Sequence, residues 1–140
     1  MDELATVCQK EQISLLPYSP IAGGVLTGKY SGPVFPPDAR FGHYRNNPSP
    51  RVQKMADRFL NEKTLAATEK YMALAGELGM EVTTLAVAWS KQHPFVASTI
   101  IGARMSSQLD ASLTAMDLNL SPETMEACRK IQQEILYPMG

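Results

Sequence analysis

Cysteine is scarce in this chain, which limits the kinds of site that it can build. The sequence holds 2 cysteines among 140 residues, Cys8 and Cys128, with no second thiol near either. Lone cysteines of this kind indicate reduced thiols rather than a disulfide framework or a cysteine metal site. We therefore expect an intracellular redox environment and predict no metal site.

Long apolar runs and an excess of one charge sign are also missing. No apolar run approaches the roughly 18 residues that a membrane helix needs, and the first residues lack the basic and apolar regions of a secretory signal. The 13 basic and 14 acidic residues give a formal net charge of -1, so no attraction to nucleic acid or to an anionic membrane is indicated. We expect a cytoplasmic protein with neither kind of partner.

The composition is that of a globular domain, with 44% hydrophobic and 19% charged residues. Periodicity and turn residues predict strands over 13–18 and 95–101, with helices over 52–92 and 106–135 and a helix before residue 13. Residues 19–30 form a loop, and residues 31–50 form a long loop whose five prolines exclude regular structure. Strands that alternate with helices predict an α/β fold with parallel strands. An independent helical domain, with the strand segments misread, is the alternative.

Several single residues predict where these elements end. Ser121 before Pro122 is typical of a helix start, and Gly79 of a helix end. Thr83 is the predicted cap of the helix over 84–92. Pro17 has no N–H for a sheet ladder, so it is placed at the end of its strand. The single tryptophan, Trp89, is predicted to lie in the core.

The loop after the first predicted strand has the composition of an anion cradle. Gly23 and Gly24 would let the backbone approach a phosphate closely, Ser19 and Thr27 offer hydroxyl groups, and Lys29 adds a positive charge. The pattern by itself is equally compatible with a plain turn after a buried strand.

Two stretches of the sequence also carry a family resemblance. Residues 18–30, Tyr-Ser-Pro-Ile-Ala-Gly-Gly-Val-Leu-Thr-Gly-Lys-Tyr, resemble the segment after the seventh strand of the aldo-keto reductase superfamily. Residues 98–104, continuing to Gln108-Leu109, resemble the end of its eighth strand and the following loop. The resemblance implies a C-terminal fragment of a TIM (β/α)8 barrel, with about two parallel strands plus several helices. A complete barrel of this kind needs about 200 to 250 residues.

The resemblance implies that NADP(H) is the cofactor and assigns residues to its parts. Tyr18 would lie against the nicotinamide, and Arg40 over the adenosine half. Arginine suits a phosphate site because its planar group can contact two oxygens together. The residues that would hold the pyrophosphate are Ser19, Pro20, Ile21, Ala22, Gly23 and Lys29. Those that would hold the 2′-phosphate are Gly102, Arg104 and Gln108. Ala111 and Ser112 depart from the family pattern, which has Glu-Asn there, so contacts to the adenine and ribose are expected to be weaker.

The activity implied is the NADP-dependent reduction of aldehydes or ketones to alcohols, with a small carbonyl substrate if the full barrel exists. The family's catalytic Asp, Tyr, Lys and His belong to early strands that would precede this chain. We therefore assign no catalytic residue and expect the chain alone to be inactive. The alternative is a non-catalytic nucleotide-binding or interaction module, because potassium-channel beta subunits resemble the same family. Exposed strand edges would also make self-association possible.

Overall fold

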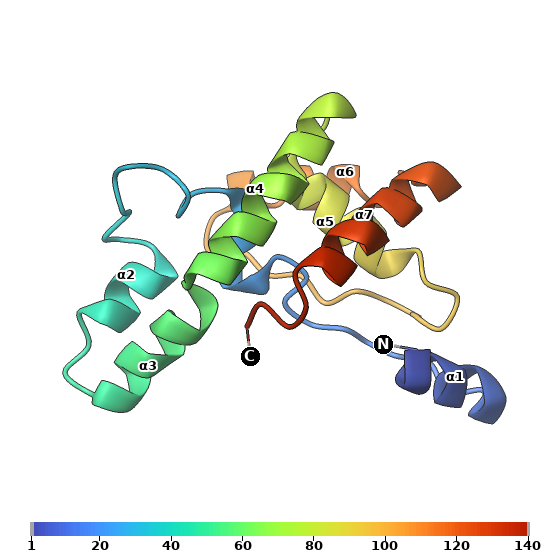
Figure 1. Ribbon diagram of the computed structural model, residues 1–140, viewed down its shortest axis with the longest axis horizontal. Coiled ribbons are helices and arrows are strands. Elements are labelled where there is room, and N and C mark those ends of the chain that lie inside the picture. The colour runs from blue at the N-terminus through green and yellow to red at the C-terminus, as the bar shows by residue number, and fades with distance from the viewer. Residues whose placement is uncertain (1, 140) are drawn as a thin grey trace.

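The computed structural model describes residues 2–139, and helices dominate this part of the chain (Figure 1). In chain order the elements are α1 (Asp2–Glu11), the short 3-10 helix η1 (Ala22–Thr27), α2 (Arg40–Arg45), α3 (Pro50–Phe59), α4 (Glu62–Glu77), α5 (Val82–Lys91), the 3-10 helix η2 (Ser106–Gln108), α6 (Asp110–Thr114) and α7 (Pro122–Glu134). None of the described helices is long and apolar enough to cross a membrane.

The two predicted strands are not formed as continuous strands. Between residues 2 and 139, β-pairing consists of two isolated parallel bridges, one joining Leu15 to Val96 and one joining Tyr18 to Ile100. The segments 13–18 and 95–101 therefore do run side by side and parallel. The prediction of continuous strands over 13–18 and 95–101 is wrong, because each segment pairs at only two positions.

Pro17 explains why the ladder does not continue. The N–H of Leu15 donates to the carbonyl of Phe95 at 2.8 Å, and the carbonyl of Leu15 accepts from Ala97 at 3.0 Å. The next donor along this edge would be residue 17, which is proline and has no N–H. The carbonyl of Pro17 instead accepts the N–H of Ile100 at 2.8 Å. The bridges pair Leu15 with Val96 and Tyr18 with Ile100, so segment 95–101 has one extra residue between them and the pairing register shifts by one.

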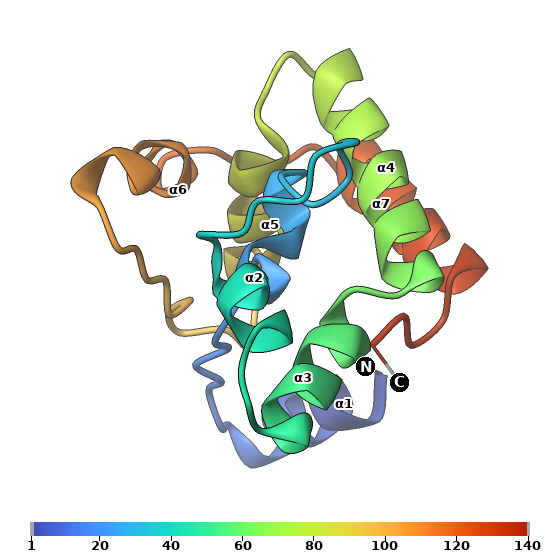
Figure 2. The same cartoon turned by 90° about the vertical axis from the view of Figure 1, so that its left-hand side faces the viewer.

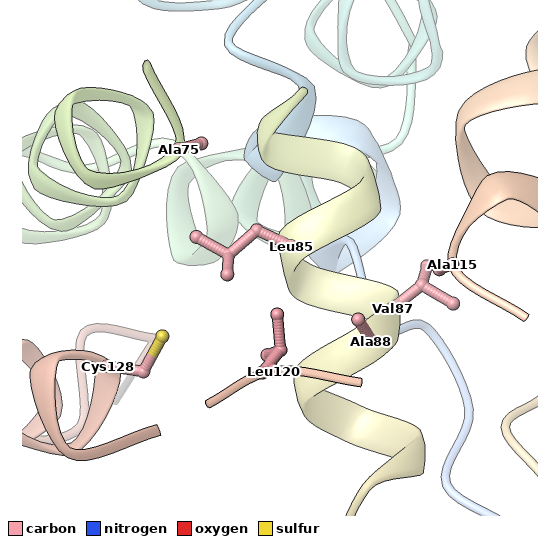
Figure 3. Close-up of a cluster of buried hydrophobic side chains, with 7 residues drawn as sticks. All are labelled: Ala75, Leu85, Val87, Ala88, Ala115, Leu120 and Cys128. Atoms are coloured by element: carbon pink, nitrogen blue, oxygen red, sulfur yellow. The ribbon is translucent and has the colours of Figure 1, made fainter. Parts of the chain in front are cut away.

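The larger core lies around α5. Leu85, Val87 and Ala88 of this helix are buried against residues from α4, α7 and the segments around α6 (Figure 3): Ala75, Ala115, Leu120 and Cys128. Trp89 packs against the same cluster, as predicted. In Figure 2, α5 lies between α6 on one side and the paired helices α4 and α7 on the other. Ile21 and Ile101, from the loops that follow the two bridged segments, also pack against this core.

The predicted start of α7 and the predicted end of α4 are confirmed, whereas the predicted start of α5 is wrong. Ser121 caps α7, its Oγ accepting the N–H of Thr124 at 3.2 Å. Gly79 ends α4 with a φ of 68°, and the N–H of Met80 reaches the carbonyl of Ala75 at 3.0 Å, as in a Schellman motif. Thr83 does not cap α5, because that helix already begins at Val82 and Thr83 is buried inside it.

A second, aromatic cluster orders the long loop. Phe41 is 1% exposed, and its ring lies 5.5 Å from the ring of Tyr30 and 5.1 Å from that of Phe59, between centroids. The N–H of Phe41 donates to the hydroxyl of Tyr30 at 3.3 Å. The interpretation of residues 31–50 as wholly irregular is therefore wrong. Their prolines flank residues 38–47 and leave that stretch free to form α2 around the buried phenylalanine.

The opposite end of the chain is packed more loosely. Residues 2–11 form the predicted helix α1, which lies apart from the other helices in Figure 1. Its apolar residues Leu4 and Val7 are 55% and 50% exposed, whereas Cys8 is buried. Large apolar side chains are also exposed on the two bridged segments, among them Leu16 and Ile100. The structure thus leaves an apolar face uncovered around the bridges.

Candidate anion-binding site

The loop after the first bridged segment has an unusual backbone. Ser19 and Ala22 have φ angles of 58° and 50°, a region that residues with a Cβ seldom occupy, and Gly23 and Gly24 follow at 65° and 101°. The hydroxyl of Ser19 accepts the N–H of Gly23 at 3.0 Å and closes the turn. Backbone strain of this kind clusters at functional sites, where surrounding packing maintains it. The loop is therefore the first candidate for a site.

Both cores hold this loop in place. Ile21 packs against the cluster around α5, whereas Val25 and Tyr30 are buried in the aromatic cluster. The hydroxyl of Thr27, predicted to offer a ligand contact, instead donates to the carbonyl of Gly24 at 2.8 Å. The loop is thus anchored at both ends, which can maintain its strained conformation.

Two positive side chains, Lys29 and Arg40, lie beside the two glycines, and a third, Arg104, is linked to the segment just before Arg40. A Cβ added to Gly24 would lie 2.9 Å from Nζ of Lys29, and one added to Gly23 would lie 3.5 Å from Nη1 of Arg40. Arg104, beyond the second bridged segment, donates from Nη1 to the carbonyl of Asp38 at 3.3 Å. This hydrogen bond ties the loop of Arg104 to the residues immediately before Arg40.

The charges in this group, called here the cation cluster (Lys29, Arg40 and Arg104), repel one another. The pKa of Lys29 is lowered, first because partial burial desolvates its ammonium group and then because Arg40 and Arg104 are positively charged. Across residues 2–139 the structure pairs none of the three with a carboxylate; its ion pairs join Lys70 to Glu134 and Arg129 to Glu126. Cations that lack a carboxylate partner and lie close together can attract an anion.

Gln108 fixes the backbone of the third cation. Its Oε1 accepts the N–H of Arg104 at 2.9 Å and that of Met105 at 3.4 Å. The side chain of Gln108 thus closes the turn from which Arg104 extends. Of the predicted cofactor residues, the structure brings together Ser19, Gly23, Lys29, Arg40, Arg104 and Gln108 around these two loops.

The remaining predicted residues lie apart from the cation cluster or serve the core. Tyr18 is 81% exposed, and a Cβ added to Gly102 would have no neighbour within 4 Å among described atoms. Ala22 packs against the aromatic cluster, Ile21 packs against the other core, and Pro20 is partly buried. In the part of the chain that the structure describes, none of these five residues forms a polar contact with Lys29, Arg40 or Arg104 through a side chain.

Sequence reasoning missed two contributors to the site. The carbonyl of Asp38 holds Arg104, and Phe41 packs beneath Gly23, where an added Cβ would lie 2.9 Å from its Cζ. Gly24, which the sequence did single out, lies under the amine of Lys29. The paired glycines and the aromatic residue after Arg40 are visible in the sequence. The contact of Asp38 uses a backbone carbonyl, which leaves no sequence signal.

The two positions that depart from the family pattern contribute to packing. Ser112 is buried, and the carbonyl of Ala111 accepts the hydroxyl of Thr84 at 2.8 Å. This contact joins α6 to α5. Neither residue offers a charged group to the cation cluster.

A separate hollow of about 540 Å³ lies between the start of α4 and the end of the chain. Asn61 donates from Nδ2 to the carbonyl of Pro138 at 2.9 Å, and Arg58 donates from Nε to the carbonyl of Met139 at 3.1 Å. Arg58, Asn61 and Tyr137 line the hollow, whereas none of the predicted cofactor residues does.

Comparison with known proteins establishes the family. The model of the aldo/keto reductase family matches residues 1–133. The chain belongs to this family, and the resemblance noted in its two sequence motifs is thereby confirmed. The family is one of oxidoreductases.

The relatives are similar along nearly the whole of this chain. It is 34% identical over 125 residues to a probable voltage-gated potassium channel subunit beta from Oryza sativa subsp. japonica, covering 86% of this chain. It is 33% identical over 135 residues to the protein tas of Escherichia coli, covering 96% of this chain. A solved structure, the glycerol dehydrogenase of Gluconobacter oxydans, matches with a TM-score of 0.66 and 28% identity over 95% of this chain.

The relatives are much longer than this chain. It covers 36% of the length of each of the two curated relatives and 38% of the glycerol dehydrogenase chain. That solved neighbour is an aldo/keto reductase with a TIM-barrel fold.

Proposed function

We propose that this chain is the dinucleotide-binding portion of an NADP(H)-dependent aldo/keto reductase that reduces aldehydes or ketones to alcohols. It corresponds in this proposal to the C-terminal part of a (β/α)8 barrel, with segments 13–18 and 95–101 in the places of two adjacent strands. The observation that carries the proposal is a group of three cations without a carboxylate partner among the described residues. Lys29 and Arg40 lie beside the strained loop at Gly23 and Gly24, and Arg104 is close enough to lower the pKa of Lys29.

The chemistry of the residues fits a phosphorylated dinucleotide. Lys29 would hold the pyrophosphate as a point charge beside the backbone of Gly23 and Gly24. The planar guanidinium group of Arg104 can bind two phosphate oxygens together, which suits the 2′-phosphate that distinguishes NADP(H) from NAD(H). Arg40 would lie over the adenosine half, and Tyr18 has an exposed ring that can lie against the nicotinamide.

Catalysis requires a second portion of the barrel in this proposal. The bound cofactor supplies a hydride, but carbonyl reduction also needs a proton donor beside the hydride. The aldo-keto reductase resemblance assigns that donor and its partners to earlier strands, which this chain does not contain. The chain alone would bind the dinucleotide without turning over a carbonyl substrate.

A non-catalytic nucleotide-binding module is the second candidate. It is favoured by one observation, the similarity to a protein described as a probable voltage-gated potassium channel subunit beta. The two candidates share the cation cluster and differ in whether catalytic residues accompany it. The coding sequence directly upstream would distinguish them, because an in-frame extension with the four catalytic residues would identify an enzyme.

Binding of NADPH and NADH to the purified chain tests the proposal. We expect the anisotropy of NADPH fluorescence to rise as the chain is added, and Arg104→Gln to weaken NADPH binding by about 10-fold or more. Losing one contact to a charged group costs about 1.5–3 kcal/mol, and 1.4 kcal/mol is a factor of ten. Binding of NADH should change little in the same variant.

Arg51→Gln is the matched control, because Arg51 is an exposed arginine at the start of α3 that, among the described residues, forms no hydrogen bond or ion pair with the cation cluster. It should leave the binding of both dinucleotides unchanged. Absence of NADPH binding by the native chain, or an equal loss in both arginine variants, would refute the proposed site.

A further inference from the structure

The amine of Lys29 differs from an ordinary surface lysine in its surroundings. It lies over the α-carbon of Gly24, where the lack of a side chain leaves room, and Lys29 as a whole is exposed to solvent. The guanidinium groups of Arg40 and Arg104 are close enough to affect its charge. Its nitrogen can therefore be reached by solutes and lies near two guanidinium groups that could attract an anion.

We propose that Lys29 is a site of covalent modification by phosphorylated aldehydes, which form an imine with its side-chain nitrogen. The arginines would bind the phosphate and so bring the aldehyde carbon of the same molecule to the amine. Binding in a fixed geometry replaces a bimolecular encounter by a reaction within a complex. This inference rests on the proposed function to the extent that both require the cation cluster to bind phosphate.

The reaction balances without any redox partner. Lys29 first releases its ammonium proton to solvent, and the free electron pair on nitrogen forms a bond to the aldehyde carbon. One proton passes from nitrogen to the former carbonyl oxygen and gives a carbinolamine; the second N–H proton then follows to the same oxygen, which leaves as water while the C=N bond forms. The products are the imine and one molecule of water, and hydrolysis reverses the sequence.

The environment favours the reactive form of the amine at Lys29. Only an unprotonated amine attacks a carbonyl, and burial together with the two positive neighbours lowers the pKa of Lys29. Tyr30 also faces the amine, its ring centroid 5.3 Å from Nζ, and this contact favours the ammonium form and opposes the other two effects. Lys70 is held in an ion pair with Glu134, and Lys91 donates to the carbonyl of Met116 at 2.7 Å. Lys54 is exposed on α3, has no hydrogen-bond or ion-pair partner in the described part of the chain, and serves as the internal reference.

An imine at Lys29 would have a consequence for the proposed cofactor site. The added group would replace the ammonium charge and occupy the space above Gly24. Dinucleotide binding and modification should therefore exclude each other. Phosphorylated aldehydes would then act as inhibitors that compete with the dinucleotide rather than with a carbonyl substrate.

Pyridoxal 5′-phosphate followed by borohydride reduction tests the inference. Reduction makes the adduct permanent, and peptide mass spectrometry gives the labelling rate at each lysine. We expect Lys29 to be labelled about 10-fold faster than Lys54, as expected for one charge-assisted phosphate contact. The ratio between the two lysines should fall towards one with pyridoxal, which lacks the phosphate, and in Arg40→Gln and Arg104→Gln. It should be unchanged in Arg51→Gln.

Equal labelling of Lys29 and Lys54 would overturn the inference, as would a preference for Lys29 that pyridoxal shares. The outcome is separable from that of the proposed function. Binding of NADPH with even labelling would refute only the inference, whereas selective labelling of Lys29 without NADPH binding would refute only the dinucleotide site. If both hold, NADPH should slow the labelling of Lys29 and leave that of Lys54 unchanged.

Discussion

Replacing Gly24 by alanine tests whether the loop positions Lys29 for an anion. Gly24 has a φ of 101°, and a Cβ added there would lie 2.9 Å from Nζ and 3.0 Å from Cε of Lys29. The end of a lysine side chain can move away, so we expect the variant to fold with its ammonium displaced. The unfavourable backbone angle should itself cost about 1–3 kcal/mol of stability.

The expected effect on binding follows from losing one charged contact. A hydrogen bond to a charged group contributes about 1.5–3 kcal/mol, so the dissociation constant for NADPH should rise about 10- to 150-fold. Isothermal titration calorimetry with NADPH measures this change, and urea denaturation measures the accompanying loss of stability. The two measurements separate displacement of the lysine from general unfolding.

Gly76→Ala is the matched control. Gly76 lies within α4, and a Cβ added there would meet no described atom within 4 Å. Alanine there should leave NADPH binding unchanged and raise stability by about 0.5–1 kcal/mol, because glycine is unfavourable inside a helix. A variant Gly24→Ala that is destabilised as expected but binds NADPH as well as the native chain would refute this account of the site.

Four further outcomes are expected. Phe41→Ala removes a fully buried ring and should cost about 3–5 kcal/mol, leaving little cooperative unfolding by urea; a change below 1 kcal/mol would contradict the aromatic cluster. Burial raises the pKa of Cys128 to about 11. Burial, together with the charge repulsion from Cys128, raises the pKa of Tyr71 to about 12. The folded chain therefore retains protons that the unfolded chain releases, so urea midpoints should fall as pH rises from about 9 to 12, less steeply in Cys128→Ala. The purified chain should not reduce an aldehyde with NADPH, and turnover that Tyr18→Phe abolishes would contradict this. The exposed apolar face around the bridged segments should make the chain self-associate or melt with weak cooperativity, whereas a sharp two-state melt of a monomer in calorimetry would show a complete domain.

The candidate site could be predicted in part because its residues come from two recognisable motifs. Ser19, Gly23 and Lys29 belong to one, and Arg104 and Gln108 to the other. Their identities, their order and the family follow from the sequence. Whether these residues bind a dinucleotide stays a prediction, because the structure shows only that their charged groups converge.

Local chemistry was sufficient where a structure depends on neighbouring residues alone. Ser121 and Pro122 start α7 because a hydroxyl and a fixed φ satisfy the first turn, and Gly79 ends α4 because it adopts a left-handed angle easily. The amphipathic spacing within α5 likewise determined that Trp89 would face the core. These features were therefore predictable from the sequence by itself.

Contacts between distant residues decided the rest. Pro17 was visible in the sequence, but the register slip that follows from it depends on Ile100, and only the folded chain brings the two together. Likewise α2 forms inside a proline-rich loop because Phe41 is buried against Tyr30 and Phe59. The link between Arg104 and the carbonyl of Asp38 brings a third cation to Lys29 and Arg40. The sequence by itself determined the family and the charged groups, whereas only the tertiary structure placed these charges together, because burial and long-range backbone contacts are not encoded in any one segment.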